Sequence, residues 1–320
     1  MSEYEQLNVG ELTVDMIRGG AILPMFRNKF FVDPVNGSDG NSGKSITNAV
    51  KSLSAGYAKL VDNKNDALIW VPGSSYLTLT STFTWAKNFT HFIGLAGPGV
   101  YGGRCRIYDL TAFATILFSI TGIGNIFKAI HWQRDYADAM GVQNVTLGVN
   151  ASYNYFEDCQ FDSPISATLG AAAYKNLTLL DGARSLTFRR CTIGQWNQQA
   201  TGASGNQLYC PGTTNGNVGT HFMDCTFLWN TTQATMKPIN VADLINEYCY
   251  MLFDRCKFLG VGTSVAGLVA SGLPAHGKLI FMNCTSVGVD EYDAGTNTRV
   301  YVANGSAIAG ELGGKAVAIG

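Results

Sequence analysis

The sequence has little charge and little proline. Only 14% of its 320 residues are charged and the formal net charge is −1. It therefore offers no basic footprint for nucleic acid or for an anionic membrane. There are 8 prolines against 37 glycines, and helix-favouring stretches of Leu, Ala, Glu and Lys are scarce. Thr, Asn, Gly, Phe and Tyr stand in their place, which favours short strands and tight turns.

Membrane and export signals are also lacking. No apolar run reaches the ~18 residues that a transmembrane helix needs. The opening "MSEYEQLNVGEL" has neither the basic region nor the apolar core of a secretory signal. The 4 histidines are scattered and none of the 8 cysteines stands in a Cys-x-x-Cys pair, which argues against a zinc site. We expect no cofactor, no nucleic-acid partner and no membrane partner.

An internal repeat is the most specific signal in the sequence. Five segments share the pattern apolar-x-Phe-x-x-Cys-x-apolar: "YNYFEDCQFD", "SLTFRRCTIG", "GTHFMDCTFL", "YMLFDRCKFL" and "KLIFMNCTSV". Their cysteines lie 28 to 34 residues apart. The last copy has Ser286 where the others have an apolar residue.

Each repeat is predicted to form three short strands. Apolar residues alternate on both sides of a tight corner, which is the period of half-buried strands. A third strand-like segment precedes most copies, at 176–180, 206–210 and 266–271. No unit of ~30 residues can bury its apolar face alone, so the units must stack. We therefore predict an all-β fold, a single-stranded right-handed parallel β-helix (solenoid).

The arginines beside Cys191 allow two interpretations. Arg190 could lower the pKa of the Cys191 thiol and make it a reactive thiolate. The repeat instead predicts that Cys191 is one member of an inward-facing core ladder of small, buried and reduced thiols, which suits assembly in a cytosol. The predicted ladder consists of Phe156, Cys159, Phe188, Cys191, Phe222, Cys225, Phe253, Cys256, Phe281 and Cys284.

The residue before each cysteine predicts a second ladder on the surface. Asp158, Arg190, Asp224 and Arg255 alternate in sign along the repeat. Stacked coils would bring neighbours to ~5 Å, where each pair contributes roughly 0.2–1 kcal/mol. We predict an Asp–Arg–Asp–Arg charge ladder.

The two ends of the chain differ from the repeats. Apolar residues over 45–61 follow helical spacing, with Ser45 as the N-cap. Such a helix would cover the open end of the solenoid core. We divide the chain into an extended arm (1–28), a β-helix body (29–300) and a tail or final strand (301–320). The apolar residues of the arm that we expect to bind a partner are Leu12, Val14, Met16, Ile17, Ile22 and Leu23.

The segment "FFVDPVNGSDGNSGKSITNAVKSLSAGYAKL", followed by "ALIWVPG", resembles the opening of right-handed parallel β-helix proteins of the pectate-lyase-like superfamily. In that superfamily a strand, an Asn/Asp/Gly loop, an amphipathic helix and an apolar strand begin the solenoid, here at 30–33, 34–43, 45–61 and 68–73. The resemblance implies this architecture for roughly 30–300. The superfamily includes polysaccharide lyases, glycoside hydrolases and bacteriophage virion proteins, and the chain is most similar to virion proteins of the head-decoration or tailspike type.

Two clusters of polar residues are candidates for chemistry. Asp33, Asn36, Asp39 and Asn41 could hold a calcium ion, or their side chains could satisfy their own backbone as Asx turns. Glu157, Asp158, Asp224 and Asp254 with Arg189 and Arg190 form the only stacked charge cluster. A glycosidase needs two carboxylates ~5–9.5 Å apart. The charge ladder explains the same residues without catalysis.

Two functions remain open. The first is a non-enzymatic structural protein of a bacteriophage virion, assembled in the host cytoplasm. It would be a homotrimeric capsid decoration (cement) protein that docks on a capsid or tail protein through its arm. The alternative is a carbohydrate-active enzyme, a polysaccharide lyase or glycoside hydrolase, either secreted or on a tailspike. Only under this alternative would a glycan bind, stacked on Trp196, Trp229, Tyr209 and Tyr250.

Overall fold

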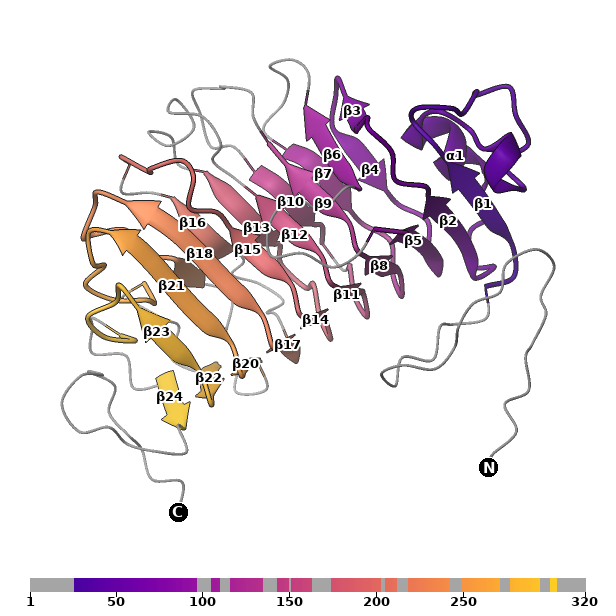
Figure 1. The fold of residues 1–320 in the computed structure, drawn as a ribbon. Helices are drawn as coiled ribbons and strands as arrows, with labels where there is room; N and C mark the ends of the chain where they lie inside the picture. Colours follow the sequence, from indigo (N-terminus) through magenta and orange to yellow (C-terminus); the bar gives the residue numbers. More distant parts are fainter. Residues whose placement is uncertain are drawn as a thin grey trace, which may run out of the picture.

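The protein is a right-handed parallel β-solenoid with one short α-helix, as predicted (Figure 1). The computed structural model describes residues 26–96, 105–109, 116–134, 143–149, 151–162, 174–202, 205–211, 218–241, 249–270, 277–293 and 300–303. The arm residues Leu12, Val14, Met16, Ile17, Ile22 and Leu23 lie outside the described residues, as does the tail after residue 303.

Three parallel sheets run along the described solenoid, and each is named by its number of strands. The ten-stranded sheet contains, in spatial order, β1 (Lys29–Val32), β2 (Asp66–Trp70), β5 (Thr90–Gly94), β8 (Ile126–Lys128), β11 (Tyr155–Glu157), β14 (Thr187–Arg189), β17 (Thr220–Met223), β20 (Tyr250–Asp254), β22 (Lys278–Met282) and β24 (Val300–Ala303). The eight-stranded sheet contains β3 (Leu77–Leu79), β6 (Arg106–Asp109), β9 (His131–Gln133), β12 (Gln160–Asp162), β15 (Thr192–Gly194), β18 (Thr226–Thr231), β21 (Lys257–Gly262) and β23 (Thr285–Val287). The six-stranded sheet contains β4 (Phe83–Trp85), β7 (Ile116–Ile120), β10 (Gln143–Leu147), β13 (Lys175–Leu179), β16 (Asn206–Cys210) and β19 (Ile239–Val241).

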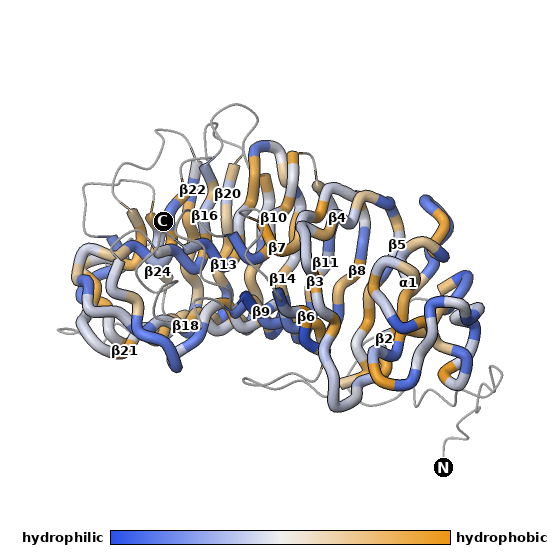
Figure 2. Tube along the Cα trace, turned by 90° about the horizontal axis from the view of Figure 1, so that it is seen from above, coloured by the Kyte–Doolittle hydropathy of each residue, from blue (hydrophilic) through white to orange (hydrophobic). Residues whose placement is uncertain are grey.

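A typical coil passes through the six-, ten- and eight-stranded sheets in that order, as β10, β11 and β12 do. The repeats stack in register, because Phe156 pairs with Phe188 and Phe188 pairs with Phe222. Figure 2 shows hydrophobic and hydrophilic residues interspersed along the coils. The apolar residues that face inward from successive coils pack on one another and form one continuous core.

The predicted helix over 45–61 is wrong in its extent. A 3₁₀ turn occupies Ile46–Asn48, and α1 spans only Leu53–Lys59. The chain between them is extended because Val50 pairs with Val32: the Val50 N–H donates to the Phe31 carbonyl at 2.9 Å. Ser52, not Ser45, is the capping side chain of α1, since its Oγ accepts the Ala55 N–H at 3.1 Å.

The short helix still covers the start of the core. Leu53 and Gly56 are its buried residues. A Cβ added to Gly56 would lie 2.7 Å from a methyl carbon of Leu68 in β2, so glycine permits this close approach. No helix in the described ranges is long and apolar enough to cross a membrane.

Candidate functional site

The corner between the ten- and eight-stranded sheets carries the residues of the predicted charge ladder. Each corner residue has a positive φ: 54° at Asp158, 50° at Arg190, 55° at Asp224, 51° at Arg255 and 54° at Asn283. This left-handed conformation turns the chain sharply at one residue. The corner residues are half-buried or exposed, while the cysteine that follows each of them is buried.

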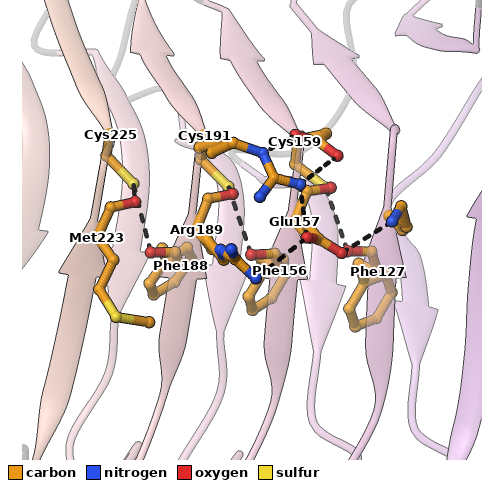
Figure 3. Close-up of polar contacts among 12 residues, drawn as sticks. Phe127, Phe156, Glu157, Cys159, Phe188, Arg189, Cys191, Met223 and Cys225 are labelled. Atoms are coloured by element: carbon orange, nitrogen blue, oxygen red, sulfur yellow. Dashed lines mark hydrogen bonds and ion pairs between the residues drawn. The ribbon is translucent and has the colours of Figure 1, made fainter. Parts of the chain in front are cut away.

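The cysteines form a buried column behind this corner. All eight are reduced and buried. Figure 3 shows the thiols of Cys159, Cys191 and Cys225 directed at phenylalanine carbonyls one coil earlier. The Cys191 S–H, for example, donates to the Phe156 carbonyl at 3.6 Å. Burial raises the pKa of the Cys159 and Cys225 thiols. Thiols that face carbonyl oxygens in an apolar core are poor nucleophiles.

The phenylalanines of the repeat stack as parallel rings beside the cysteines. The Phe188 ring centroid lies 4.7 Å from those of Phe156 and Phe222. Phe253 and Phe281 continue the stack at 4.9 and 4.7 Å. The structure therefore places all ten residues of the predicted core ladder in one buried column.

The four charged corner residues lie in two pairs. Arg190 donates to Asp158 from Nε at 2.8 Å and from Nη2 at 3.0 Å. Arg255 repeats this with Asp224, at 2.8 and 3.2 Å. Each arginine reaches back to the preceding coil, and no ion pair within 4.0 Å joins Arg190 to Asp224, although both are described.

Glu157 is the most enclosed carboxylate of this cluster. It is 4% exposed and accepts from Lys128 Nζ at 2.9 Å and from Arg190. Burial acts to raise the pKa of Glu157, but the hydrogen bonds and charges of Lys128 and Arg190 outweigh it and lower that pKa. The pKa of Asp224 is lowered too, first by the Arg255 hydrogen bond. A general acid needs the opposite shift, so these two carboxylates are held as ion-pair partners.

The Asn/Asp/Gly loop after β1 binds its own backbone. Asp33 Oδ1 accepts the N–H groups of Val35 and Asn36 at 2.8 and 3.0 Å. Asp39 Oδ1 accepts the N–H groups of Lys51 and Ser52 at 2.9 and 2.7 Å. The contacts of Asp33 form an Asx turn, as the sequence predicted, whereas Asp39 holds the backbone that leads into α1. The described residues contain no group of three or more His, Cys, Asp or Glu side chains placed to hold a metal ion.

The four aromatic residues proposed for glycan stacking do not lie together. Tyr209, Trp229 and Tyr250 belong to the six-, eight- and ten-stranded sheets respectively. Trp229 is fully buried, and Trp196 donates its Nε1–H to the Leu259 carbonyl at 3.2 Å. Side chains from three different sheets, one of them fully buried, do not make one stacking platform.

A lysine that the sequence analysis missed lies on the six-stranded sheet. Lys175 Nζ donates to Asn206 Oδ1 at 2.6 Å and lies 4.8 Å from the centroid of the Tyr209 ring. Burial lowers the pKa of Lys175 to about 8. The available signal was a lysine at the start of an apolar strand, "YKNLTLL". An amine with this pKa can serve as a base near neutral pH.

A set of three hydrogen-bonded polar side chains lies on the eight-stranded sheet. Arg106 Nε donates to His131 Nδ1 at 3.3 Å, and His131 Nε2 lies 3.3 Å from Asp162 Oδ2. Nδ1 is then the acceptor of the imidazole, so Nε2 carries the proton toward the carboxylate. No sequence pattern points to the contact between His131 and Asp162, because it arises only when β9 and β12 pair as neighbouring strands of the stack.

No family model matches the chain, and no curated protein matches it. Several solved structures do match the chain. A rhamnogalacturonan lyase matches at 12% identity with a TM-score of 0.60, over 86% of this chain and 73% of that one. A pectin methylesterase from Aspergillus niger matches at 13% identity and a TM-score of 0.56, over 92% of both chains. Pectate lyase Pel9A matches at 14% identity and a TM-score of 0.50, over 92% and 82%.

The chain has the pectate lyase-like fold. These likenesses support the right-handed parallel β-helix of the sequence prediction. At 11–14% identity they carry the architecture alone, because one fold hosts many functions. The three structures named above are enzymes and none is a virion protein, so the virion part of the resemblance stays a prediction.

Proposed function

We propose that the chain is a non-enzymatic structural protein of a bacteriophage virion. In this proposal the solenoid is the rigid body of a homotrimeric capsid decoration protein, and the arm at 1–28 docks it on a capsid or tail protein. The proposal rests on the sequence resemblance and on one feature of the surface, namely the ion pairs that the charged corner residues form between coils.

The observation that supports a structural role is the pairing of the stacked charges from coil to coil. Glu157, Asp158 and Asp224 each have an arginine or lysine partner on a neighbouring coil within 2.9 Å. Asp254 pairs with Arg255, which follows it in sequence. The same contacts lower the pKa of Glu157 and Asp224. Catalytic pairs of carboxylates work because their environments push their pKa values apart. Here both values move in the same direction, which suits a clamp between coils.

The experiment is to locate the chain in the virus. An antibody raised against the purified full-length chain would be applied to gradient-purified particles, and the particle proteins would be quantified by mass spectrometry. We expect labelling on the particle surface and a constant copy number relative to the major capsid protein. A chain that stays wholly in the soluble fraction after particles are removed would contradict the proposal.

A second candidate is a polysaccharide-acting enzyme, and Lys175 is the observation that favours it. Its amine has a pKa lowered to about 8 by burial, and Asn206 and Tyr209 lie beside it. Solved structures of the same fold include a rhamnogalacturonan lyase and a pectate lyase. A lyase needs a base that removes a proton from the sugar, and a partly neutral lysine meets that need.

The two candidates separate in one assay. The full chain would be incubated with polygalacturonate, methylated pectin and rhamnogalacturonan, while unsaturated products and methanol are measured. The structural proposal expects neither product. Product formation that is abolished by Lys175→Met and retained by Lys128→Met would establish the enzyme, because Lys128 is a surface ion-pair partner of Glu157.

A further inference from the structure

The corner between the six- and ten-stranded sheets is a second ladder of left-handed residues. It consists of Asn63, Phe89, Gly124, Tyr153, Ser185 and Gly219, with φ between 46° and 68°. Each of the first five donates its N–H to a carbonyl of the next coil, as Tyr153 does to Arg184 at 2.9 Å. Asn and Gly are the residues that this conformation favours.

Phe89 and Tyr153 break that preference. A bulky aromatic residue with positive φ is an outlier that local conformation does not explain. Burial does not explain it either, because Phe89 is 49% exposed and Tyr153 is 68% exposed. The Phe89 ring lies over Gly124, where an added Cβ would come within 2.5 Å of it. The chain therefore keeps two unfavourable backbone positions and leaves both rings in solvent.

Two further apolar side chains are exposed in the turns of the same corner. Val61, before β2, is 50% exposed, and Val149, between β10 and β11, is 54% exposed. We call Val61, Phe89, Val149 and Tyr153 the aromatic corner. Exposed apolar residues that gather in one place mark a surface that another segment covers, and aromatic residues carry most of the binding energy at such contacts.

The described chain begins beside the aromatic corner. The Arg27 N–H donates to the Asn65 carbonyl at 2.9 Å, two residues from Asn63. The Phe26 ring lies 5.0 Å from the ring of His91, two residues from Phe89. Phe26 also packs against a small apolar cluster on the outer face of β2 and β5, which includes Ile69 and Ile93. The 25 residues that precede Phe26 must therefore start from this edge of the solenoid.

We propose that the chain's own apolar arm, residues 12–23, packs along the aromatic corner. Ile22 is four positions before Phe26, and an extended chain spans about 13 Å over four such steps. Phe89 and Tyr153 are two coils apart, about 10 Å, a separation shorter than the span from Phe26 to Ile22. A covalently attached segment has a high effective concentration at such a site. The proposal concerns two parts of one chain, so it does not depend on the function proposed above.

This contact gives the arm a stowed position on the body. Burial of the two rings would offset the unfavourable φ at Phe89 and Tyr153.

The experiment uses Arg18, which is the only trypsin site in residues 1–25. Cleavage after Arg18 would be timed by mass spectrometry in the intact full-length chain and in a free peptide of residues 12–25. We expect cleavage in the chain to be slower by roughly tenfold or more. In a Phe89→Asn, Tyr153→Asn double variant the protection should be lost while the thermal midpoint stays the same or rises, because Asn suits the left-handed corner.

Ser185→Asn is the matched control, since it makes the same change on the same ladder away from the arm; it should keep the protection. Tyr153→Phe should keep it as well, because the ring is retained. Cleavage as fast in the chain as in the free peptide would overturn the proposal. Protection that grows with protein concentration would also overturn it, because the occupant would then be the arm of a second copy.

Discussion

Arg190 and Asp158 form a bidentate ion pair across neighbouring coils, with Nε–Oδ1 at 2.8 Å and Nη2–Oδ2 at 3.0 Å. The pair belongs to residues 32 positions apart in sequence. Both residues have the left-handed backbone of the corner, so their side chains leave the solenoid at equivalent points. Arg255 and Asp224 repeat the geometry two coils later.

The first prediction is a coupling energy between these two residues. In a double-mutant cycle of Arg190→Gln and Asp158→Asn, measured by urea unfolding, we expect about 0.5–1 kcal/mol. The value is modest because the Arg190 side chain is 41% exposed, and it should fall as salt is added. The same cycle across Arg190 and Asp224 should give a smaller coupling, because Arg190 acts on Asp224 through its charge and not through an ion pair within 4.0 Å. Equal coupling in both cycles would show a continuous ladder.

The second prediction concerns the thiols. All eight cysteines are buried, and the thiol of Cys191 faces the carbonyls of Phe156 and Arg189. We expect a thiol reagent to label none of them in the folded protein at pH 8 and all of them in guanidinium chloride. Labelling of Cys191 within seconds under native conditions would restore the reactive-thiolate interpretation. The arginine next to a cysteine in sequence would then outweigh the packing of the repeat.

The repeat made the solenoid predictable because its period is longer than any single strand and survives changes in individual residues. Phe188 and Cys191 could be assigned to the core from alternation alone. The preceding coils have strands at 90–94, 126–128 and 131–133 but lack the Phe-x-x-Cys pattern, for physical reasons. Cys105 occupies the ladder position, with its thiol 3.9 Å from the Trp70 carbonyl, but an insertion separates it from Phe92. In the next coil Ile130 stands where the others have cysteine.

The parts that sequence could not provide depend on tertiary contacts. The helical spacing over 45–61 predicted one long helix, but Val50 forms a β-bridge with Val32 instead. Pairing with β1 satisfies the backbone N–H and C=O groups of this segment. Two features follow from the stacking of coils. One is that Arg190 pairs with Asp158 of the preceding coil, and the other is the burial that lowers the pKa of Lys175. The first leaves no pattern in the sequence, and the second leaves only a lysine at the start of an apolar strand.

The third prediction is a pH dependence from His91. Ile126 N–H donates to His91 Nδ1 at 3.0 Å, and His91 Nε2 donates to Asn65 Oδ1 at 2.6 Å. Burial lowers the pKa of His91 to about 4, against a smaller opposing effect of Asp66. The unfolded chain, with a histidine pKa near 6.5, therefore binds more protons than the folded chain between pH 4 and 6.5. Stability must fall as pH decreases through that window.

The free energy of unfolding should drop by about 3 kcal/mol between pH 7 and pH 4 from this one group. Urea unfolding at half-unit steps would measure it. The interval from pH 6.5 to 5 excludes the carboxylates with lowered pKa values, such as Glu157, because they lose their contribution only below their unfolded pKa. The His91 part is then the difference between the protein and a variant without this histidine. His91→Gln should flatten the slope in this interval. A slope that survives the substitution would assign the effect to another group.

The fourth prediction tests whether the phenylalanine stack acts as one column. Phe188 has parallel ring neighbours on both sides, Phe156 and Phe222, at 4.7 Å. Phe281 ends the stack, with Phe253 as its one parallel ring partner among the described residues. Both side chains are fully buried. Replacing either by alanine removes the same apolar area, so a difference between the two variants measures the coupling between coils.

We expect Phe188→Ala to cost roughly 3–5 kcal/mol of unfolding free energy and Phe281→Ala to cost less. In a solenoid each coil is stabilised only by its neighbours, so a cavity in the middle weakens two interfaces and one at the end weakens mainly one. The Phe188 variant should also broaden the urea transition, because the halves on either side of it can unfold separately. Equal costs with unchanged cooperativity would mean that ring stacking adds nothing beyond the burial of each side chain.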